Sequence, residues 1–176
     1  MTLQRGTVYY ISSDGDDNNS GKSPNRAWKT IERVNAQSYS PGEKILFRGG
    51  EEFEGTIIFT SEDAGSHESR VIISSFGAER AIIMGMGKEG IRVDSCHFLG
   101  ISNLNLIGSG RKSGNNSDGL FIQKSDGVIL DNLETSGFQH SGIHLHQCND
   151  AVITHVYAHE NGFAGIHVTG NTIWDT

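Results

Sequence analysis

Six of the eight histidines in this 176-residue chain lie between residues 140 and 167, and three of them share one pattern. His144 and His146 alternate with apolar residues, and His167 follows His144 by 167 − 144 = 23 residues in a second copy of that pattern. Imidazole titrates near neutral pH and can transfer protons, and it also binds transition metals. His144, His146 and His167 are therefore the candidate catalytic residues. A transition-metal site on the same residues and a surface ladder without chemistry are the alternatives.

Other polar and aromatic residues occupy equivalent positions in further copies of the pattern. Every second residue of a half-buried strand points to the same face, so these side chains are expected to form one outer surface. Phe121 would serve as a stacking platform for a sugar ring. The expected substrate-binding residues are Arg92, Asp94, Phe121, Gln123 and Thr169. His155 and His159 lie on a later part of the repeat and are expected to face solvent.

Glycines mark the repeat that must position these residues. Gly119, Gly142 and Gly165 each begin an alternating apolar run, and their separations are 142 − 119 = 23 and 165 − 142 = 23 residues. Gly90 begins an earlier copy 119 − 90 = 29 residues upstream, with the excess in the polar segment 108–117. The insertion at 108–118, which includes Arg111, Lys112 and Asp118, either walls a substrate groove or is a plain surface loop. Each copy offers about three short strands and leaves no room for a crossover helix.

A unit of this kind cannot bury its own apolar face and must stack on its neighbours. The sequence therefore predicts an all-β fold, a parallel β-helix in which a single chain winds as a solenoid. Equivalent residues are expected about 4.8 Å apart in adjacent windings. Gly119, Gly142 and Gly165 are expected to form one column on the exterior.

The two ends of the chain are predicted to differ. Ser23-Pro24 is typical of a helix start, and Trp28, Ile31 and Val34 then fall on one helical face that would cap the coil. We expect one domain over residues 1–176, in which 1–50 hold the first strand, cap helix and first coil, and 51–176 the stacked coils. The C-terminal end is expected to be incomplete and uncapped, and to offer a surface through which copies associate.

Composition excludes several classes of protein. The formal charge of −7 argues against a nucleic-acid partner, and no apolar stretch reaches the roughly 20 residues of a membrane span. Cys96 and Cys148 take the same position two windings apart, about 9.6 Å, which exceeds the roughly 7 Å limit for a disulfide. Two unpaired thiols are predicted. The loop Asp14–Asn19 suggests calcium, although a turn closed by its own side chains explains it better.

Several segments resemble the pectate-lyase-like right-handed parallel β-helix superfamily. Residues 9–31 are similar to the first strand, glycine/aspartate loop and cap helix of its secreted members, and residues 41–50 and 71–85 to the coils that follow. The resemblance implies a right-handed coil and a substrate site on the outer face of the first parallel sheet. It also implies a secreted or cell-surface protein, whose signal is absent from residues 1–5, and it makes calcium a possible cofactor.

The expected activity is β-elimination or epimerisation of an acidic, uronate-containing polysaccharide. A histidine would act as base, and Arg92 or a metal would neutralise the carboxylate. No carboxylate is evident in the sequence to orient the histidine rings. A non-catalytic glycan-binding or structural module, similar to an adhesin or tailspike, is the alternative. A glycoside hydrolase ranks third, since it needs two carboxyl groups flanking one groove and Asp94 has no evident partner.

Overall fold

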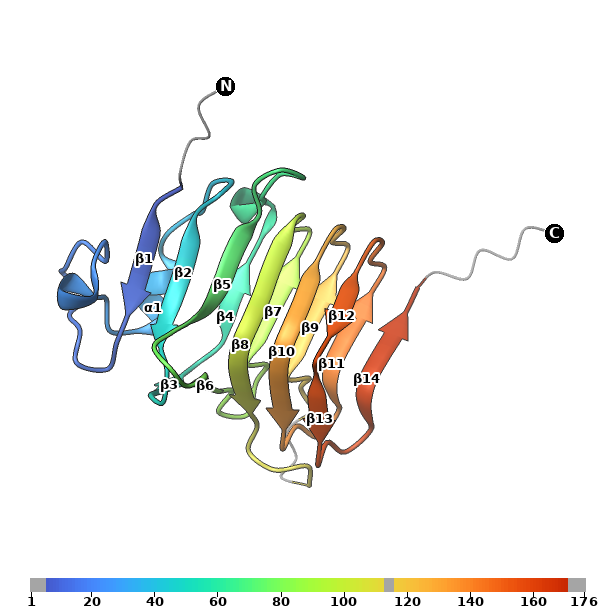
Figure 1. Ribbon diagram of the computed structural model, residues 1–176. Coiled ribbons are helices and arrows are strands. Elements are labelled where there is room, and N and C mark those ends of the chain that lie inside the picture. The colour runs from blue at the N-terminus through green and yellow to red at the C-terminus, as the bar shows by residue number, and fades with distance from the viewer. Residues whose placement is uncertain (1–5, 113–115, 171–176) are drawn as a thin grey trace.

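The computed structural model describes residues 6–112 and 116–170, whose regular secondary structure is almost entirely parallel strands (Figure 1). The strands form two sheets. Sheet A contains β1 (Val8–Ile11), β2 (Lys44–Arg48), β5 (Val71–Phe76), β8 (Leu99–Ile107), β10 (Ile129–Ser136) and β12 (Val152–Thr154), with β3 (Glu52–Glu54), β6 (Ala81–Met84) and β13 (Tyr157–His159) attached. Sheet B contains β4 (Ile57–Phe59), β7 (Ile91–Asp94), β9 (Leu120–Gln123), β11 (Ser141–His146) and β14 (Ala164–Thr169).

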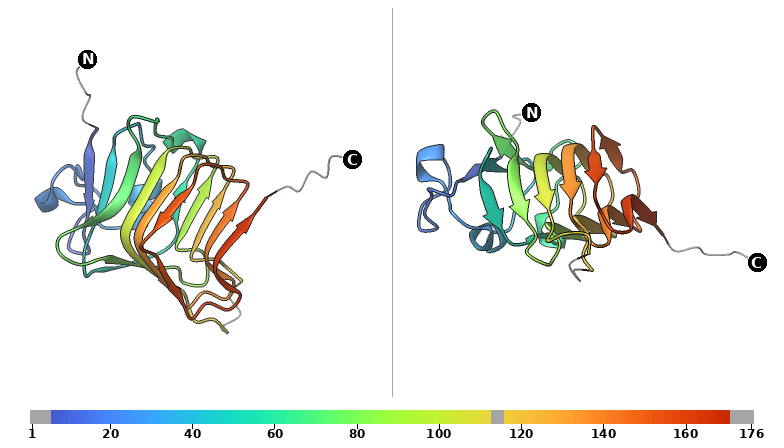
Figure 2. Two further views of the ribbon diagram at one scale, coloured as in Figure 1. Left: turned by 45° about the vertical axis from the view of Figure 1, so that its right-hand side comes forward. Right: turned by 90° about the horizontal axis from the view of Figure 1, so that it is seen from below.

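The chain winds as a coil, passing from sheet A to sheet B and back (Figure 2). Strands of sheet A therefore alternate along the chain with single strands of sheet B, and each strand pairs with its equivalent in the next winding. β9 pairs with β11, and β11 with β14, in a register that joins Phe121 to His144 and His144 to His167. These offsets equal the 23-residue spacing of the glycines, so the predicted stacking is confirmed.

Asparagines bend the long strands of sheet A. Asn103 in β8 and Asn132 in β10 have φ values of 53° and 52°, in the left-handed region that asparagine adopts more readily than most residues. The Asn132 Nδ2 group donates to Asn103 Oδ1 at 2.7 Å, which links the bends of adjacent windings. Each winding thus has three straight segments, as the repeat predicts.

Apolar columns fill the interior of the coil. Ile91, Leu120 and Ile143 are paired in adjacent strands and fully buried, and each such side chain contributes about 1.5–3 kcal/mol to folding. Ile166 and Val168 extend the columns of the final described winding but remain 44% and 67% exposed. Association of copies through this end, and the division of the chain at residue 50, stay predictions.

The glycine column is buried, which corrects the prediction of an exterior column. Gly119, Gly142 and Gly165 do lie in adjacent windings, but a Cβ at Gly119 would come within 2.8 Å of the ring of Phe138, a fully buried residue. A Cβ at Gly142 would lie 2.3 Å from Thr135 Oγ1. Gly119 and Gly142 thus occupy a tight corner against the core, where a side chain has no room, and Gly165 is half-buried beside Ala158.

The capping helix is shorter than predicted. α1 spans Ile31–Asn35, and Thr30 is its N-cap through a bond from the Arg33 N–H. Ser23-Pro24 instead begins a separate 3-10 turn. Trp28 is extended because its backbone pairs with Tyr10 and Ser12, although its ring is buried with Ile31 and Val34 as expected.

The loop Asp14–Asn19 is closed by its own hydrogen bonds. Asp16 accepts from the Asn18 backbone at 2.9 Å, and Asp17 accepts from the backbones of Lys29 and Thr30 at 2.8 and 3.0 Å. These carboxylates hold the turn and the start of α1, which agrees with the turn interpretation.

Both cysteines are free, as predicted. Burial raises the pKa of the Cys96 thiol to about 12. No helix among the described residues is long and apolar enough to cross a membrane.

Candidate functional site

The outer face of sheet B carries all eight predicted site residues in two columns. Strand pairing aligns Ile58, Arg92, Phe121, His144 and His167 in the first column. It aligns Asp94, Gln123, His146 and Thr169 in the second column. The alternation of each strand sends these side chains outward while their neighbours enter the core. The positions were predictable, and the contacts between them define the chemistry.

Arg92 and Phe121 form the part of the face nearest the start of the coil. The Arg92 guanidinium lies 5.1 Å from the centre of the Phe121 ring and 3.6 Å from the Glu89 carboxylate. The Arg92 side chain is 40% exposed, so its charge is accessible to a ligand. A cleft of about 500 Å³ adjoins it, lined in part by Thr56, Met86 and Glu89.

Asp118 is the carboxylate that the sequence did not reveal. It ends the polar segment before β9 and accepts from the Ser141 backbone N–H of the next winding at 2.8 Å. Its two oxygens also lie 2.6 Å from His140 Nδ1 and 3.1 Å from His144 Nδ1. The expectation that no carboxylate orients the histidine rings is therefore wrong. The available signal was the position of Asp118, directly before the glycine of its copy.

A directed chain of hydrogen bonds leads from Asp118 across the face. Because the ionised carboxylate only accepts, His144 donates from Nδ1 and its Nε2 is left to accept from the Thr169 hydroxyl, 3.0 Å away. Thr169 Oγ1 in turn accepts from His146 Nδ1 at 2.8 Å. This assignment leaves the lone pair of His146 on Nε2, so the chain fixes which nitrogen of His146 is basic.

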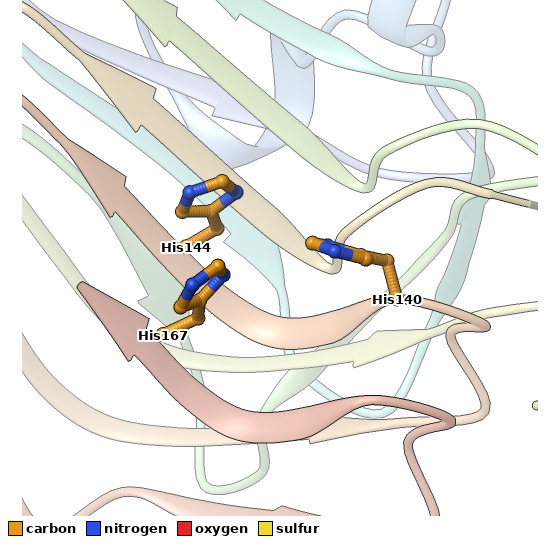
Figure 3. Close-up of side chains that lie close together, drawn as sticks. All are labelled: His140, His144 and His167. Atoms are coloured by element: carbon orange, nitrogen blue, oxygen red, sulfur yellow. The ribbon is translucent and has the colours of Figure 1, made fainter. Parts of the chain in front are cut away.

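Three histidines form a cluster beside this chain, namely His140, His144 and His167 (Figure 3). The rings of His144 and His167 are stacked, with centres 4.4 Å apart, and His140 lies to their side at 5.7 Å from each. Nδ1 of His167 is buried without a hydrogen-bond partner in the part of the chain that the structure describes. Phe163 covers His140 in a stack with ring centres 4.9 Å apart. His140 and Phe163 were not predicted, because they lie in turns outside the alternating strands.

Asp94 is held as an anion in the second column. The Gln123 amide donates to it at 2.5 Å and the Ser95 hydroxyl at 2.9 Å. These hydrogen bonds, the Gln123 bond foremost, lower the pKa of the Asp94 carboxyl below its usual value. Asp94 is therefore suited to accept hydrogen bonds and poorly suited to donate a proton.

Some polar residues lie apart from this face. His155 is paired with Asp131 on the outer face of sheet A at 2.8 Å and is exposed as expected. His159 is less exposed than predicted, since it pairs with Glu134 at 3.2 Å and stacks on Tyr157.

Comparison with known proteins finds one curated relative and several solved structures that are similar to this chain. No family model matches it. A lacto-N-biosidase of Bifidobacterium longum is 29% identical over 139 residues, which cover 76% of this chain and 8% of that protein. The chain thus spans less than a tenth of this curated relative.

Three solved structures share the fold. A GH136 lacto-N-biosidase from Eubacterium ramulus aligns with a TM-score of 0.62 at 17% identity, covering 96% of this chain and 35% of that one. A rhamnogalacturonan lyase aligns with a TM-score of 0.64 at 15% identity, covering 91% and 43%. An alginate lyase from Paenibacillus aligns with a TM-score of 0.59 at 19% identity, covering 79% and 48%. Polysaccharide lyases and a glycoside hydrolase are thus both similar in fold, and the reaction must be argued from the site.

Proposed function

We propose that this chain is part of a right-handed parallel β-helix that acts on an acidic, uronate-containing polysaccharide by β-elimination. The glycan would lie along the coil on the outer face of sheet B, at a secreted or cell-surface location. The observation that carries the proposal is the hydrogen-bond chain from Asp118 to His146, on the same face as the exposed Arg92 guanidinium. Elimination from a uronic acid needs this pair of groups, a base and a fixed positive charge.

His146, Arg92 and Phe121 take separate roles in the proposed reaction. The uronate ring stacks on Phe121 and its carboxylate pairs with Arg92. Nε2 of His146 accepts the proton from C5, and the electron pair of that C–H bond moves toward the carboxylate, where Arg92 stabilises the developing charge. The C4–O bond then breaks, a C4–C5 double bond forms, and the leaving oxygen takes a proton from water. Epimerisation shares the first step but returns the proton to the opposite face of C5.

His144 and Asp118 are positioning residues in this scheme. Both ring nitrogens of His144 are already engaged, Nδ1 by Asp118 and Nε2 by Thr169. His144 therefore acts through Thr169, keeping the proton of His146 on Nδ1. Gln123 and Asp94 lie in the same column as His146 and offer hydrogen bonds to sugar hydroxyls.

The test is to incubate the protein with polygalacturonate, alginate and chondroitin and to follow the ultraviolet absorbance of the unsaturated product. One substrate is expected to give a product that is lost in the His146→Ala variant. Binding of all three without turnover would favour the non-catalytic module. The absence of both binding and turnover with all three polysaccharides would refute the assignment of this face to acidic glycans.

A glycoside hydrolase is the second candidate, favoured by the likeness to two lacto-N-biosidases. Asp94 and Asp118 are the carboxylates on the face that would have to serve as the catalytic pair. Asp94 is held ionised, and Asp118 is bound to two histidines and a backbone N–H. Neither is suited to be the general acid, so this candidate ranks below elimination. Release of a disaccharide from a chromogenic lacto-N-bioside would reverse that order.

A further inference from the structure

We propose that His140, His144 and His167 bind a divalent transition metal, of which zinc is the preferred example. One ring nitrogen from each residue lies within 4.8 Å of the other two. Three imidazoles are a donor set typical of zinc, cobalt, nickel and copper, whereas calcium and magnesium require oxygen ligands. The proposal does not depend on the proposed function, because binding is measured without glycan.

Asp118 prepares two of the three ligands. Its oxygens lie 2.6 Å from Nδ1 of His140 and 3.1 Å from Nδ1 of His144, so it holds both rings beside the proposed metal position. A carboxylate behind the ligating histidines fixes their tautomer and raises their basicity. Asp118 is itself only 10% exposed and is anchored to the Ser141 backbone, so it supplies a fixed negative charge next to the cation.

A second, independent observation comes from the contacts of His167. Its Nδ1 is buried and has no hydrogen-bond partner among residues 6–112 and 116–170, and a buried polar atom of this kind is costly unless something satisfies it. Its ring is stacked on His144 and faces the edge of His140. A metal between the three rings would satisfy this nitrogen.

The rings need a modest rearrangement to bind. Zinc–nitrogen bonds of about 2.0–2.1 Å in a tetrahedron place the nitrogens about 3.4 Å apart, closer than the 4.8 Å limit of the present arrangement. His144 and His167 are stacked with 23° between their planes, so one ring must turn about its Cβ–Cγ bond, a torsion that is soft in histidine. Phe163, stacked on His140, would screen one side of the site from water.

The composition of the site differs from the set that the sequence alone suggested. His146 was the third candidate ligand, but its Nδ1 is bound to Thr169 and its ring centre is 6.3 Å from that of His144. His140 takes its place, from the turn before β11. The His146→Ala variant therefore separates the two possible sites.

The test is isothermal titration of chelator-treated protein with zinc, together with the visible spectrum of the cobalt-loaded protein. One zinc per chain and a tetrahedral cobalt spectrum are expected. His167→Ala and His140→Ala are each expected to weaken binding at least about 100-fold, and Asp118→Asn about 10- to 100-fold. Circular dichroism checks that each variant is folded.

His155→Ala and His146→Ala serve as controls and are expected to leave the zinc affinity unchanged. Loss of binding in His146→Ala would overturn the assignment of the three ligands. Absence of saturable zinc binding by the unmodified protein, or competition by calcium at equal concentration, would overturn the site itself, whichever variants fold.

Discussion

Carboxylate–histidine pairs occur on both outer faces of the coil, and they differ in their surroundings. On sheet A, Asp131 meets His155 at 2.8 Å, but the two side chains are 45% and 81% exposed. On sheet B, Asp118 serves His140 and His144 together and is 10% exposed. Water screens the first pair and contributes little to the second. A carboxylate–histidine pair therefore does not by itself identify a functional site, whereas a buried carboxylate shared by two histidine rings does.

The largest expected difference between the faces is in catalysis. His146→Ala is expected to lower kcat of the proposed elimination about 10²- to 10⁴-fold, the usual contribution of a general base. His155→Ala, on sheet A, is expected to leave kcat unchanged. Initial rates of unsaturated-product formation measure both, and an equal loss in the two variants would mean that the sheets are not functionally distinct.

Arginines on the two faces are also expected to differ in their effect on kcat/KM. Arg92→Ala removes the exposed charge above Phe121 and is expected to lower kcat/KM about 10²-fold, as loss of a charge-stabilising group does. Arg80 is instead bound to Glu134 at 2.9 Å and to Asn132 on sheet A, so Arg80→Ala is expected to leave kcat/KM unchanged. Steady-state kinetics on the substrate identified above compare them, and Arg92→Lys tests whether charge alone suffices.

Asp118 and Asp131 are expected to differ in how much they contribute to the stability of the protein. Asp118→Asn removes the negative charge and one of the two acceptor oxygens that serve the Ser141 N–H and two rings, at a cost of about 2 kcal/mol, which lowers Tm by about 4–8 °C in a domain of this size. Asp131→Asn changes an exposed group and is expected to leave Tm unchanged. Thermal unfolding followed by circular dichroism compares them. Equal Tm values for the two variants would contradict the importance of burial.

The smallest expected effect concerns pH. Both Asp94 and Asp131 have a lowered pKa, Asp94 chiefly through the Gln123 amide and Asp131 chiefly through His155. A carboxyl whose pKa is lower in the folded than in the unfolded state stabilises the fold above its unfolded pKa, and that contribution is lost as pH falls through the folded pKa. Gln123→Ala is expected to raise the pKa of Asp94 and leave that of Asp131 unchanged.

Nuclear magnetic resonance titration of the carboxyl carbons measures both pKa values in the Gln123→Ala variant. His155→Ala is the reciprocal control, since it should move Asp131 and not Asp94. If Gln123→Ala leaves the pKa of Asp94 unchanged, the amide is not the main cause of the shift.

The residues that the sequence placed correctly all lie in the repeat. Phe121, His144 and His167 are spaced by 23 residues, and a parallel register converts that spacing into one column. Alternation then separates outward His144 from inward Leu145. These features depend only on the period of the chain, which the glycines display directly.

The residues that the sequence missed lie between the repeated strands. Asp118 and His140 belong to turns, where contacts depend on how the backbone bends and not on a period. The length of the cap helix was overestimated for a similar reason, since Trp28 fits a helical face but its backbone pairs with Tyr10 and Ser12 in a strand-like bridge. Tertiary pairing thus overrides local pattern at each of these points.

The polar segment between β8 and β9 has a consequence for engineering. It lengthens its winding from 23 to 29 residues, yet Arg92 and Phe121 stay in register across it. Doubling the length of a loop adds only about 0.6 kcal/mol to the entropic cost of closing it. Residues 111–116 are accordingly expected to tolerate replacement, whereas Gly108, Gly110 and Ser117 are hydrogen-bonded to the next winding. Replacing residues 111–116, with Asp118 retained, is expected to change which ligands reach Arg92 and Phe121. The Tm of the protein is expected to stay unchanged.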